Sequence, residues 1–260
     1  MNLTKASYKV TTVFILVFSI LVSLQAPAFV ADPDLLWKVI SSQCVPNQKA
    51  NKDPDPCVEV TLQKDGPQGY AVLKDLTGPY QYLLLPTTKV TGIESPVVLT
   101  ANSPNYFYQA WEARSHMEKI YGAPIPPEEI SLTVNSRYGR SQNQLHIHIS
   151  CTRQDVKALV QSNLENIAAA WSLFPGGILG HRYYARRITM QQLKEQNAFK
   201  LLADDLPKAK SNMYEFGLGV MAVKNLKGEI EFVMLADQVK LLEMDLGHVE
   251  EIQDHQCPQL

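Results

Sequence analysis

The chain has no excess of charge of either sign. Its 260 residues include 24 lysines and arginines and 26 aspartates and glutamates, which gives a net charge of −2. A strongly basic field, which would attract nucleic acids, is therefore missing, and we expect no nucleic-acid partner. Binding partners have to be inferred from local sites instead.

Cysteine is scarce, with four residues at positions 44, 57, 151 and 257. None of them has Cys-x-x-Cys spacing, which argues against a zinc site made of cysteines. In an exported protein an even number of cysteines suggests disulfides, with three possible pairings. Cys44 and Cys57 flank a polar, proline-rich loop, so we expect these two to pair, which leaves Cys151 for Cys257. Free buried thiols are the alternative.

The N-terminus has a basic start and then lacks charge up to Ala31. Lys5 and Lys9 precede the uncharged run 10–31. A secretory signal peptide that is cleaved after Ala28 or Ala31 fits this pattern, and so does an uncleaved anchor, since about 20 apolar residues span a bilayer. The run alone does not decide between the two. Either one places residues 32–260 outside the cytoplasm, with the lysines inside.

The clearest functional pattern is a strict alternation along residues 142–150. Leucine and isoleucines at 145, 147 and 149 fall on one side, and the other side carries Gln144, His146, His148 and Ser150. A period of two is typical of a half-buried β-strand. Side chains at i and i+2 lie roughly 6.5–7 Å apart, so both histidines could contact one phosphate.

Three interpretations of this strand are open. It could be an exposed polar face that happens to carry histidines. It could be a His-x-His metal site, which would need a third ligand. In the third interpretation, one imidazole is a nucleophile and its neighbour handles the proton.

The remaining segments predict an α+β fold, with an antiparallel meander and packed helices. The expected strands are 58–62, 70–73, 80–85, 130–134, 216–224 and 230–235, and the expected helices are 103–121, 153–167, 191–202 and 249–256. The loop 137–141, with Arg140 and a glycine, suits the binding of an anion. The strand–turn–strand unit after about residue 190 suggests a degenerate second copy of the first half, which lacks a His-x-His pair.

The segment Gln144-Leu145-His146-Ile147-His148 resembles the His-φ-His-φ-His signature of the histidine-triad superfamily of nucleotide hydrolases and transferases. The resemblance implies that His146 attacks the α-phosphorus and that His148 is the third member. Run 135–141 resembles the phosphate-binding segment of that superfamily, which implies that Asn135, Ser141 and Gln144 hold phosphate oxygens. Gln144 replaces a histidine and cannot titrate. His148 therefore becomes the stronger candidate for protonating the leaving phosphate.

A longer stretch, from about Leu36 to Cys257, resembles the bacterial CDP-diacylglycerol pyrophosphatases. The matching pieces include Cys-Val-Pro-Asn-Gln at Cys44, Gln-Tyr-Leu-Leu-Leu-Pro at Gln81, and Glu-Ile-Gln-Asp-His-Gln-Cys ending at Cys257. This resemblance implies hydrolysis of the lipid substrate CDP-diacylglycerol to CMP and phosphatidate. It also favours retention of residues 1–31 as a single span in the bacterial inner membrane, with a periplasmic catalytic domain 32–260.

We expect no metal or other cofactor in this reaction, because an imidazole with a pKa near 6.5 is nucleophilic near neutral pH without one. Two alternatives belong to other classes of protein. A His-x-His metalloenzyme would lose its activity to chelators. A non-catalytic exported module that binds nucleotides or lipids would tolerate the replacement of His146.

Overall fold

The computed structural model describes residues 32–63 and 68–257. The expected signal peptide or anchor, residues 1–31, lies outside this part of the chain. None of the helices within the described residues combines the length and apolar character that crossing a bilayer requires.

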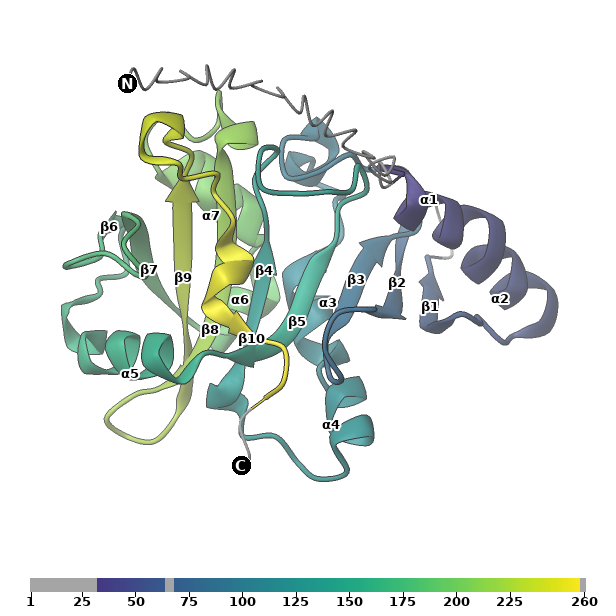
Figure 1. The fold of residues 1–260 in the computed structure, drawn as a ribbon, viewed down its shortest axis with the longest axis horizontal. Coiled ribbons are helices and arrows are strands. Elements are labelled where there is room, and N and C mark those ends of the chain that lie inside the picture. The colour runs from purple at the N-terminus through teal and green to yellow at the C-terminus, as the bar shows by residue number, and fades with distance from the viewer. Residues whose placement is uncertain (1–31, 64–67, 258–260) are drawn as a thin grey trace, which may run out of the picture. The chain divides into compact units, whose positions relative to one another are not determined.

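Ten strands in the described residues form one sheet (Figure 1). They are β1 (Cys57–Leu62), β2 (Gly69–Lys74), β3 (Tyr82–Pro86), β4 (Ile130–Val134), β5 (Ile147–Thr152), β6 (Ser172–Leu173), β7 (Tyr183–Thr189), β8 (Phe216–Lys224), β9 (Ile230–Gln238) and β10 (Gln253–Asp254). The order is β1-β2-β3-β5-β4-β8-β9-β7-β6, and β10 pairs with β5. Every pairing between these strands is antiparallel.

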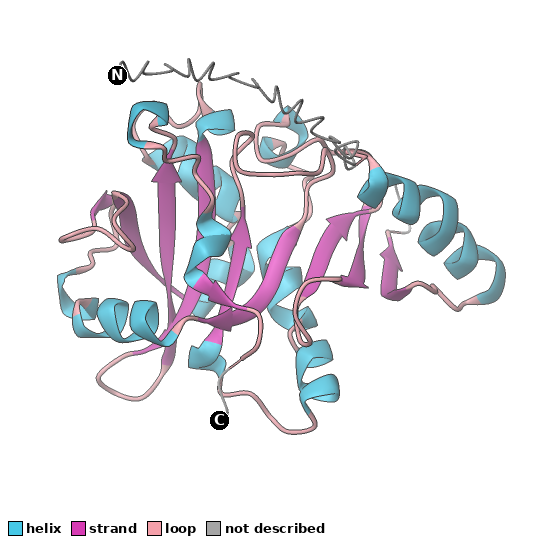
Figure 2. Ribbon diagram, in the orientation of Figure 1, coloured by secondary structure: helices cyan, strands magenta, loops and turns pink. Residues whose placement is uncertain are grey.

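The helices are mostly short (Figure 2). They are α1 (Leu35–Val39), α2 (Val45–Asn51), α3 (Tyr106–Ala113), α4 (Ser115–Tyr121), α5 (Gln154–Ser162), α6 (Met190–Glu195) and α7 (Ala198–Asp205). A π-helical turn, Ile40–Cys44, joins α1 to α2. Single 3-10 turns cover Pro96–Leu99, Pro127–Glu129, Leu164–Asn166, Met213–Glu215, Leu241–Glu243 and Val249–Ile252.

The connections on the two sides of the central β4–β8 pair follow one pattern. On one side β2 and β3 are adjacent, α3 and α4 follow, and the chain then enters β4 and β5. On the other side β6 and β7 are adjacent, α6 and α7 follow, and the chain enters β8 and β9. The strand order, read outward from the centre, is β4-β5-β3-β2 in the first half and β8-β9-β7-β6 in the second.

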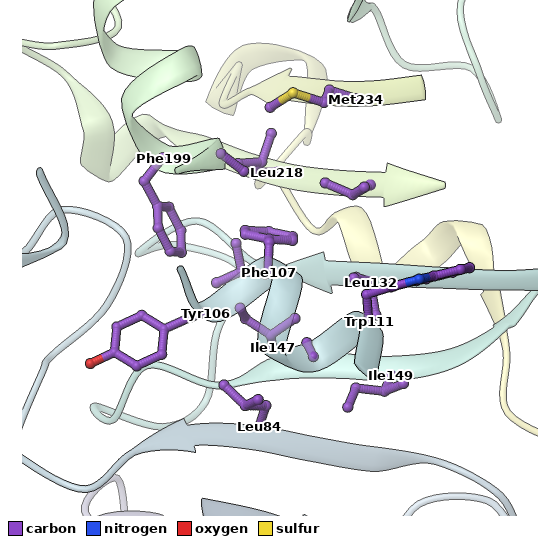
Figure 3. Packing of buried hydrophobic residues seen from close by; sticks show 14 of the residues in the cluster. Leu84, Tyr106, Phe107, Trp111, Leu132, Ile147, Ile149, Phe199, Leu218 and Met234 are labelled. Atoms are coloured by element: carbon purple, nitrogen blue, oxygen red, sulfur yellow. The ribbon is translucent and has the colours of Figure 1, made fainter. Parts of the chain in front are cut away.

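One face of the sheet packs on the main hydrophobic core. Helix α3 contributes Phe107 and Trp111, and α7 contributes Phe199. Figure 3 shows these side chains against Leu132, Ile147 and Ile149 of the central strands. The apolar side of the alternating segment therefore faces this core, as its period predicted. The expected strand over residues 142–150 is wrong at its start, because β5 begins at Ile147 and both Gln144 and His146 precede it.

The opposite face has two smaller cores. One lies under α5 and includes Val156, Val160, Val233 and Leu235. The other lies between β1–β3 and the π-helical turn and includes Ile40, Val60 and Leu83. On this face β5 presents His148, Ser150 and Thr152, which belong to neither apolar cluster. The polar face of β5 is thus left for the C-terminal segment to cover.

Two glycines of β8 let the C-terminal segment approach that face. A Cβ atom at Gly217 would lie 2.4 Å from the carbonyl oxygen of Gly247 and 2.5 Å from Cγ2 of Val249. One at Gly219 would lie 3.0 Å from Cγ1 of Val249. The close passage needs residues without side chains there. Figure 1 shows the segment (yellow) crossing the sheet on its way to β5.

The sequence-based expectations hold for the mixed α/β class with a large antiparallel sheet and for most strands. The expected helix 103–121 is instead two helices separated at Arg114, and its N-cap is Asn105, whose side chain accepts from the amide of Tyr108. The expected terminal helix 249–256 is wrong, because a 3-10 turn there leads into β10. Strand β7 was missed, since Arg186 and Arg187 make it look like a basic surface cluster.

The structure contains both expected disulfides, Cys44–Cys57 and Cys151–Cys257. The segment between the first pair is not a loop as predicted, because α2 occupies it up to Asn51. The second disulfide fastens the C-terminal segment to β5, where β10 pairs with Cys151 and Thr152.

The two disulfides should differ in their effect on stability. They close segments with sequence separations of 13 and 106 residues, and chain entropy predicts losses of about 3 and about 4–5 kcal/mol when they are removed. We expect the double variant Cys151→Ala/Cys257→Ala to lose more free energy of unfolding in urea than Cys44→Ala/Cys57→Ala. The reverse order would contradict the entropic interpretation.

Candidate active site

A cavity of about 530 Å³ opens on the polar face of β5. Its walls are apolar on the α1 side and polar near β5. The lining residues include Leu35, Leu36 and Val39 of α1, Lys74 to Thr77 after β2, Ser141, Gln142, His146, His148 and Glu250. The histidine pair therefore lines a cavity whose other wall is the first helix after residue 31.

His146 is held in one tautomer by its own backbone. Its Nδ1 lies 2.7 Å from the carbonyl oxygen of Gln144, an atom that can only accept. Nδ1 therefore carries the proton, and Nε2 keeps its lone pair. Burial lowers the pKa of His146 below its ordinary value. The imidazole is thus a neutral base and nucleophile at neutral pH.

His148 lies beside His146, with ring centroids 4.8 Å apart in an edge-to-face arrangement. Its Nδ1 is 3.2 Å from Oε1 of Glu250 and 3.1 Å from Nε2 of Gln81. The Gln81 amide has the Asp75 and Glu250 carboxylates for its two hydrogens, so we assign the Nδ1 proton of His148 to Glu250. Among the described residues, Nε2 of His148 has no hydrogen-bond partner.

The carboxylate of Glu250 is the centre of this site. Besides His148, its Oε1 lies 3.4 Å from Nε2 of His255, and its Oε2 lies 3.4 Å from Nε2 of His248. Asn135 donates to Oε2 over 3.1 Å and accepts from the backbone amide of Glu250 over the same distance. Three imidazoles and the carboxamides of Asn135 and Gln81 thus surround one largely buried acid, whose side chain is 15% exposed.

These contacts set the charge of the site. Burial by itself would raise the pKa of Glu250, but hydrogen bonds from His248 and His255 and the nearby His148 hold it well below its ordinary range. Burial lowers the pKa of His148 to about 3, against the opposing effect of Glu250. The hydrogen bond to Glu250 raises the pKa of His248. The free site therefore has an ionised acid next to two neutral imidazoles, those of His146 and His148.

The predicted phosphate-contacting residues have other partners in this structure. The Gln144 amide is fully used, because it donates to the carbonyls of Pro86 and Thr88 and accepts from the amide of Val90. Arg140 forms a bidentate pair with Glu94 at 2.6 and 2.7 Å.

Four backbone amides of the loop 137–141, which would have to donate to a bound anion, already have partners within the protein. The amides of Tyr138 and Gly139 donate to Oγ of Ser136, and the amides of Arg137 and Arg140 donate to backbone carbonyls. Ser141 lines the cavity, and Asn135 orients Glu250. Contact of any of these residues with phosphate stays a prediction.

Sequence reasoning missed Glu250, Gln81 and the supporting role of His255. No feature of the sequence pointed to a role of His255 in the site. In the structure its Nδ1 contacts Oγ of Ser150 at 3.2 Å, and its Nε2 contacts Glu250. One signal was present. The expected Cys151–Cys257 disulfide already implied that the residues before Cys257 lie against the histidine strand.

The His-x-His metal interpretation gains no third ligand. In the described part of the chain, the ligand-type side chains that converge on one point are His181, Asp237 and Asp245, and neither His146 nor His148 belongs to that group. At His146, Nδ1 is bonded to the Gln144 carbonyl, and the neighbouring His148 is oriented by Glu250.

The lowered histidine pKa values predict how stability depends on pH. Below pH about 6.5 the unfolded chain protonates both histidines, whereas folded His148 stays neutral down to about 3. The free energy of unfolding should therefore fall as the pH drops through this window, by up to about 1.4 kcal/mol per pH unit for each histidine. Urea unfolding between pH 7 and pH 4.5 measures this slope. His148→Gln should reduce the slope, and an unchanged slope would contradict the assignment.

Comparison with known proteins identifies the family. The family model described as CDP-diacylglycerol pyrophosphatase matches residues 31–260. A protein from Yersinia pestis named CDP-diacylglycerol pyrophosphatase is 48% identical over 227 residues, which cover 87% of this chain and 85% of the relative. The match includes β5, the cavity wall and the C-terminal segment that carries Glu250. This chain belongs to the CDP-diacylglycerol pyrophosphatase family.

Proposed function

We propose that this chain hydrolyses the pyrophosphate bond of CDP-diacylglycerol and releases CMP and phosphatidate. Family membership supports the substrate and the reaction. The observation that carries the chemistry is the bond from Nδ1 of His146 to the Gln144 carbonyl, which leaves Nε2 as a nucleophile in the cavity.

In the first step, Nε2 of His146 attacks the α-phosphorus of the cytidine half. The bond between that phosphorus and the bridging oxygen breaks, and phosphatidate leaves. In the second step, water attacks the phosphorus of the nucleotidyl-histidine and gives a proton to Nε2 of His148, which lost one to phosphatidate in the first step. The phosphorus–nitrogen bond breaks, and CMP is released. Because His146 is neutral when free, the attack needs no prior loss of a proton.

His148 is the group that we assign to the leaving oxygen. A bound pyrophosphate brings negative charge next to its ring, which raises the pKa of an imidazole. Glu250 accepts the Nδ1 proton and stabilises the imidazolium, so Nε2 can donate to the leaving phosphate. Substrate binding would then generate the acid in the place where it acts.

The cavity suits a substrate with a charged and an apolar half. Leu35, Leu36 and Val39 form its apolar wall, and Leu76, which is 97% exposed, belongs to its lining too. We assign the lipid half of the substrate to this wall, because it offers apolar surface beside the histidines.

We further propose that residues 1–31 anchor the chain in the bacterial inner membrane, with the catalytic domain in the periplasm. The basic start, the uncharged run and two disulfides support this proposal. The residue after this segment, Asp32, is three positions before the cavity helix α1. A topology reporter fused after Leu260 that reads out the cytoplasmic side would overturn it.

We also propose that the fold is histidine-triad-like and internally duplicated. The support is the shared connection pattern of β2–β5 and β6–β9 around the β4–β8 pair. The second half would then begin near β6, before residue 190, where the sequence pattern suggested a boundary. The strand equivalent to β5 is β9, in which Val233 and Leu235 are buried in an apolar core and no histidine occurs.

Replacing the two histidines should separate their roles. His146→Ala should abolish both turnover of CDP-diacylglycerol and any covalent adduct. His148→Ala should slow turnover by about 10²–10⁴-fold but still allow some adduct. Glu250→Gln should change the rate in the same direction as His148→Ala, because it removes the negative charge that stabilises the His148 imidazolium. The rates are measured in a turnover assay with a chelator present and absent.

The adduct is detected with substrate labelled in the cytidine half, an acid-free quench and peptide mapping. His116→Ala is the matched control, because His116 bonds Glu59 at 3.0 Å and does not line the cavity. Label on His148, or full activity in His146→Ala, would refute the mechanism. Full activity in that variant would favour a binding module or another catalytic centre.

A further inference from the structure

A second cluster of potential ligands lies outside the catalytic cavity. It is formed by His181 in the β6–β7 loop, Asp237 near the end of β9 and Asp245 in the segment that leads to Glu250. One ligand atom from each of these residues lies within 4.8 Å of the others. The proposed hydrolytic mechanism uses none of the three.

Asp237 is the unusual member of this cluster. Asp237 is fully buried, and in the described part of the chain neither of its carboxylate oxygens accepts a hydrogen bond from an N–H group or a hydroxyl. Only a proton shared with Asp245 would give it a partner. Oδ2 of Asp245, which is 1% exposed, also has none, although Lys240 Nζ lies 3.6 Å from it. Buried carboxylates without partners carry a large desolvation cost, which a bound cation would offset.

His181 is oriented as a metal ligand would be. Its Nδ1 lies 3.0 Å from Oε1 of Glu251, which also accepts the hydroxyl of Tyr183 over 2.7 Å. The carboxylate accepts the Nδ1 proton, so the lone pair is on Nε2. A carboxylate behind a histidine is the usual support of a metal-ligating imidazole.

We propose that His181, Asp237 and Asp245 bind a divalent cation of the zinc type as a structural site. One imidazole and two carboxylates suit zinc or manganese better than calcium or magnesium, which prefer oxygen ligands. Zinc ligands in a tetrahedral site are about 3.5 Å apart, so the ligand atoms must approach by about 1 Å. The side chain of His181, which is 31% exposed, is the one that can move.

The site would fasten the segment that carries the catalytic acid. Oδ1 of Asp245 accepts a hydrogen bond from the amide of Gly247 over 3.0 Å. Glu250 and Glu251 are three and four residues after Gly247. The cation would thus join β9, the β6–β7 loop and residues 245–251. A proton would compete with the cation for this site, because burial and the neighbouring Asp245 raise the pKa of Asp237 to about 8.

The test measures metal, not activity, so its result does not depend on the proposed hydrolase function. The full chain, without a histidine tag, is purified in detergent, stripped with a chelator and titrated with zinc chloride. We expect elemental analysis by mass spectrometry to find about one tightly bound zinc ion per chain. The melting temperature of the protein should rise with zinc concentration. Manganese should act in the same way, and calcium should not.

Variants locate the ion. Asp237→Asn and His181→Ala should each abolish the tight binding, and Glu251→Gln should weaken it by about 10–100-fold. His181→Ala keeps the experiment decisive if Asp237→Asn does not fold. Asp204→Asn is the matched control, because Asp204 pairs with surface lysines and should leave binding unchanged.

Two results would overturn the proposal. One is the absence of stoichiometric zinc at saturating concentration in folded protein, which would leave the shared proton as the occupant. The other is binding that survives in both His181→Ala and Asp237→Asn but is lost in His148→Gln, which would place the ion in the catalytic cavity.

Discussion

The contact between the Glu250 carboxylate and His148 is the interaction on which the site depends. A largely buried carboxylate needs partners, and Glu250 obtains them from His148, His248, His255 and Asn135. Because it accepts the Nδ1 proton of His148, it decides which nitrogen of that ring faces the cavity. The C-terminal segment brings Glu250 to these partners, and three features fix its path. Gly217 lets the segment cross β8, β10 pairs with β5, and the disulfide to Cys151 closes the arrangement.

The two imidazoles of the proposed mechanism are oriented in different ways, and this difference supports the different roles that we propose for them. His146 is bonded to the carbonyl oxygen of Gln144, and both residues come just before β5. A carbonyl has no charge to stabilise an imidazolium, so this ring suits nucleophilic attack. His148 is bonded to an ionised acid, so this ring can hold a proton once substrate adds negative charge. Gln144, at the first position of the triad pattern, bonds the backbone of residues 86–90 and supports the strand.

The two halves of the sheet differ in what covers their corresponding faces. On the polar face of β5 the neighbouring apolar clusters leave a gap, and the cavity opens there beside α1. On the same face of β9, α5 and residues of the C-terminal 3-10 turn cover Val233 and Leu235. The C-terminal segment thus packs on β9 through Val249 and Ile252, and the cavity beside β5 is where we propose that the substrate binds.

The sequence by itself determined the alternation around His146, the strands with regular apolar patterns and the family resemblance, because these depend on local periodicity and short motifs. It also indicated both disulfides. It did not reveal Glu250 as the partner of His148, since 102 positions separate them and nothing in their local patterns links them. The tertiary structure decided that Arg140 pairs with Glu94, that Asn135 holds Glu250, and that the strand containing Arg186 and Arg187 joins the sheet. Long-range packing assigns the partners of polar side chains, and a linear pattern contains no information about which distant residue supplies them.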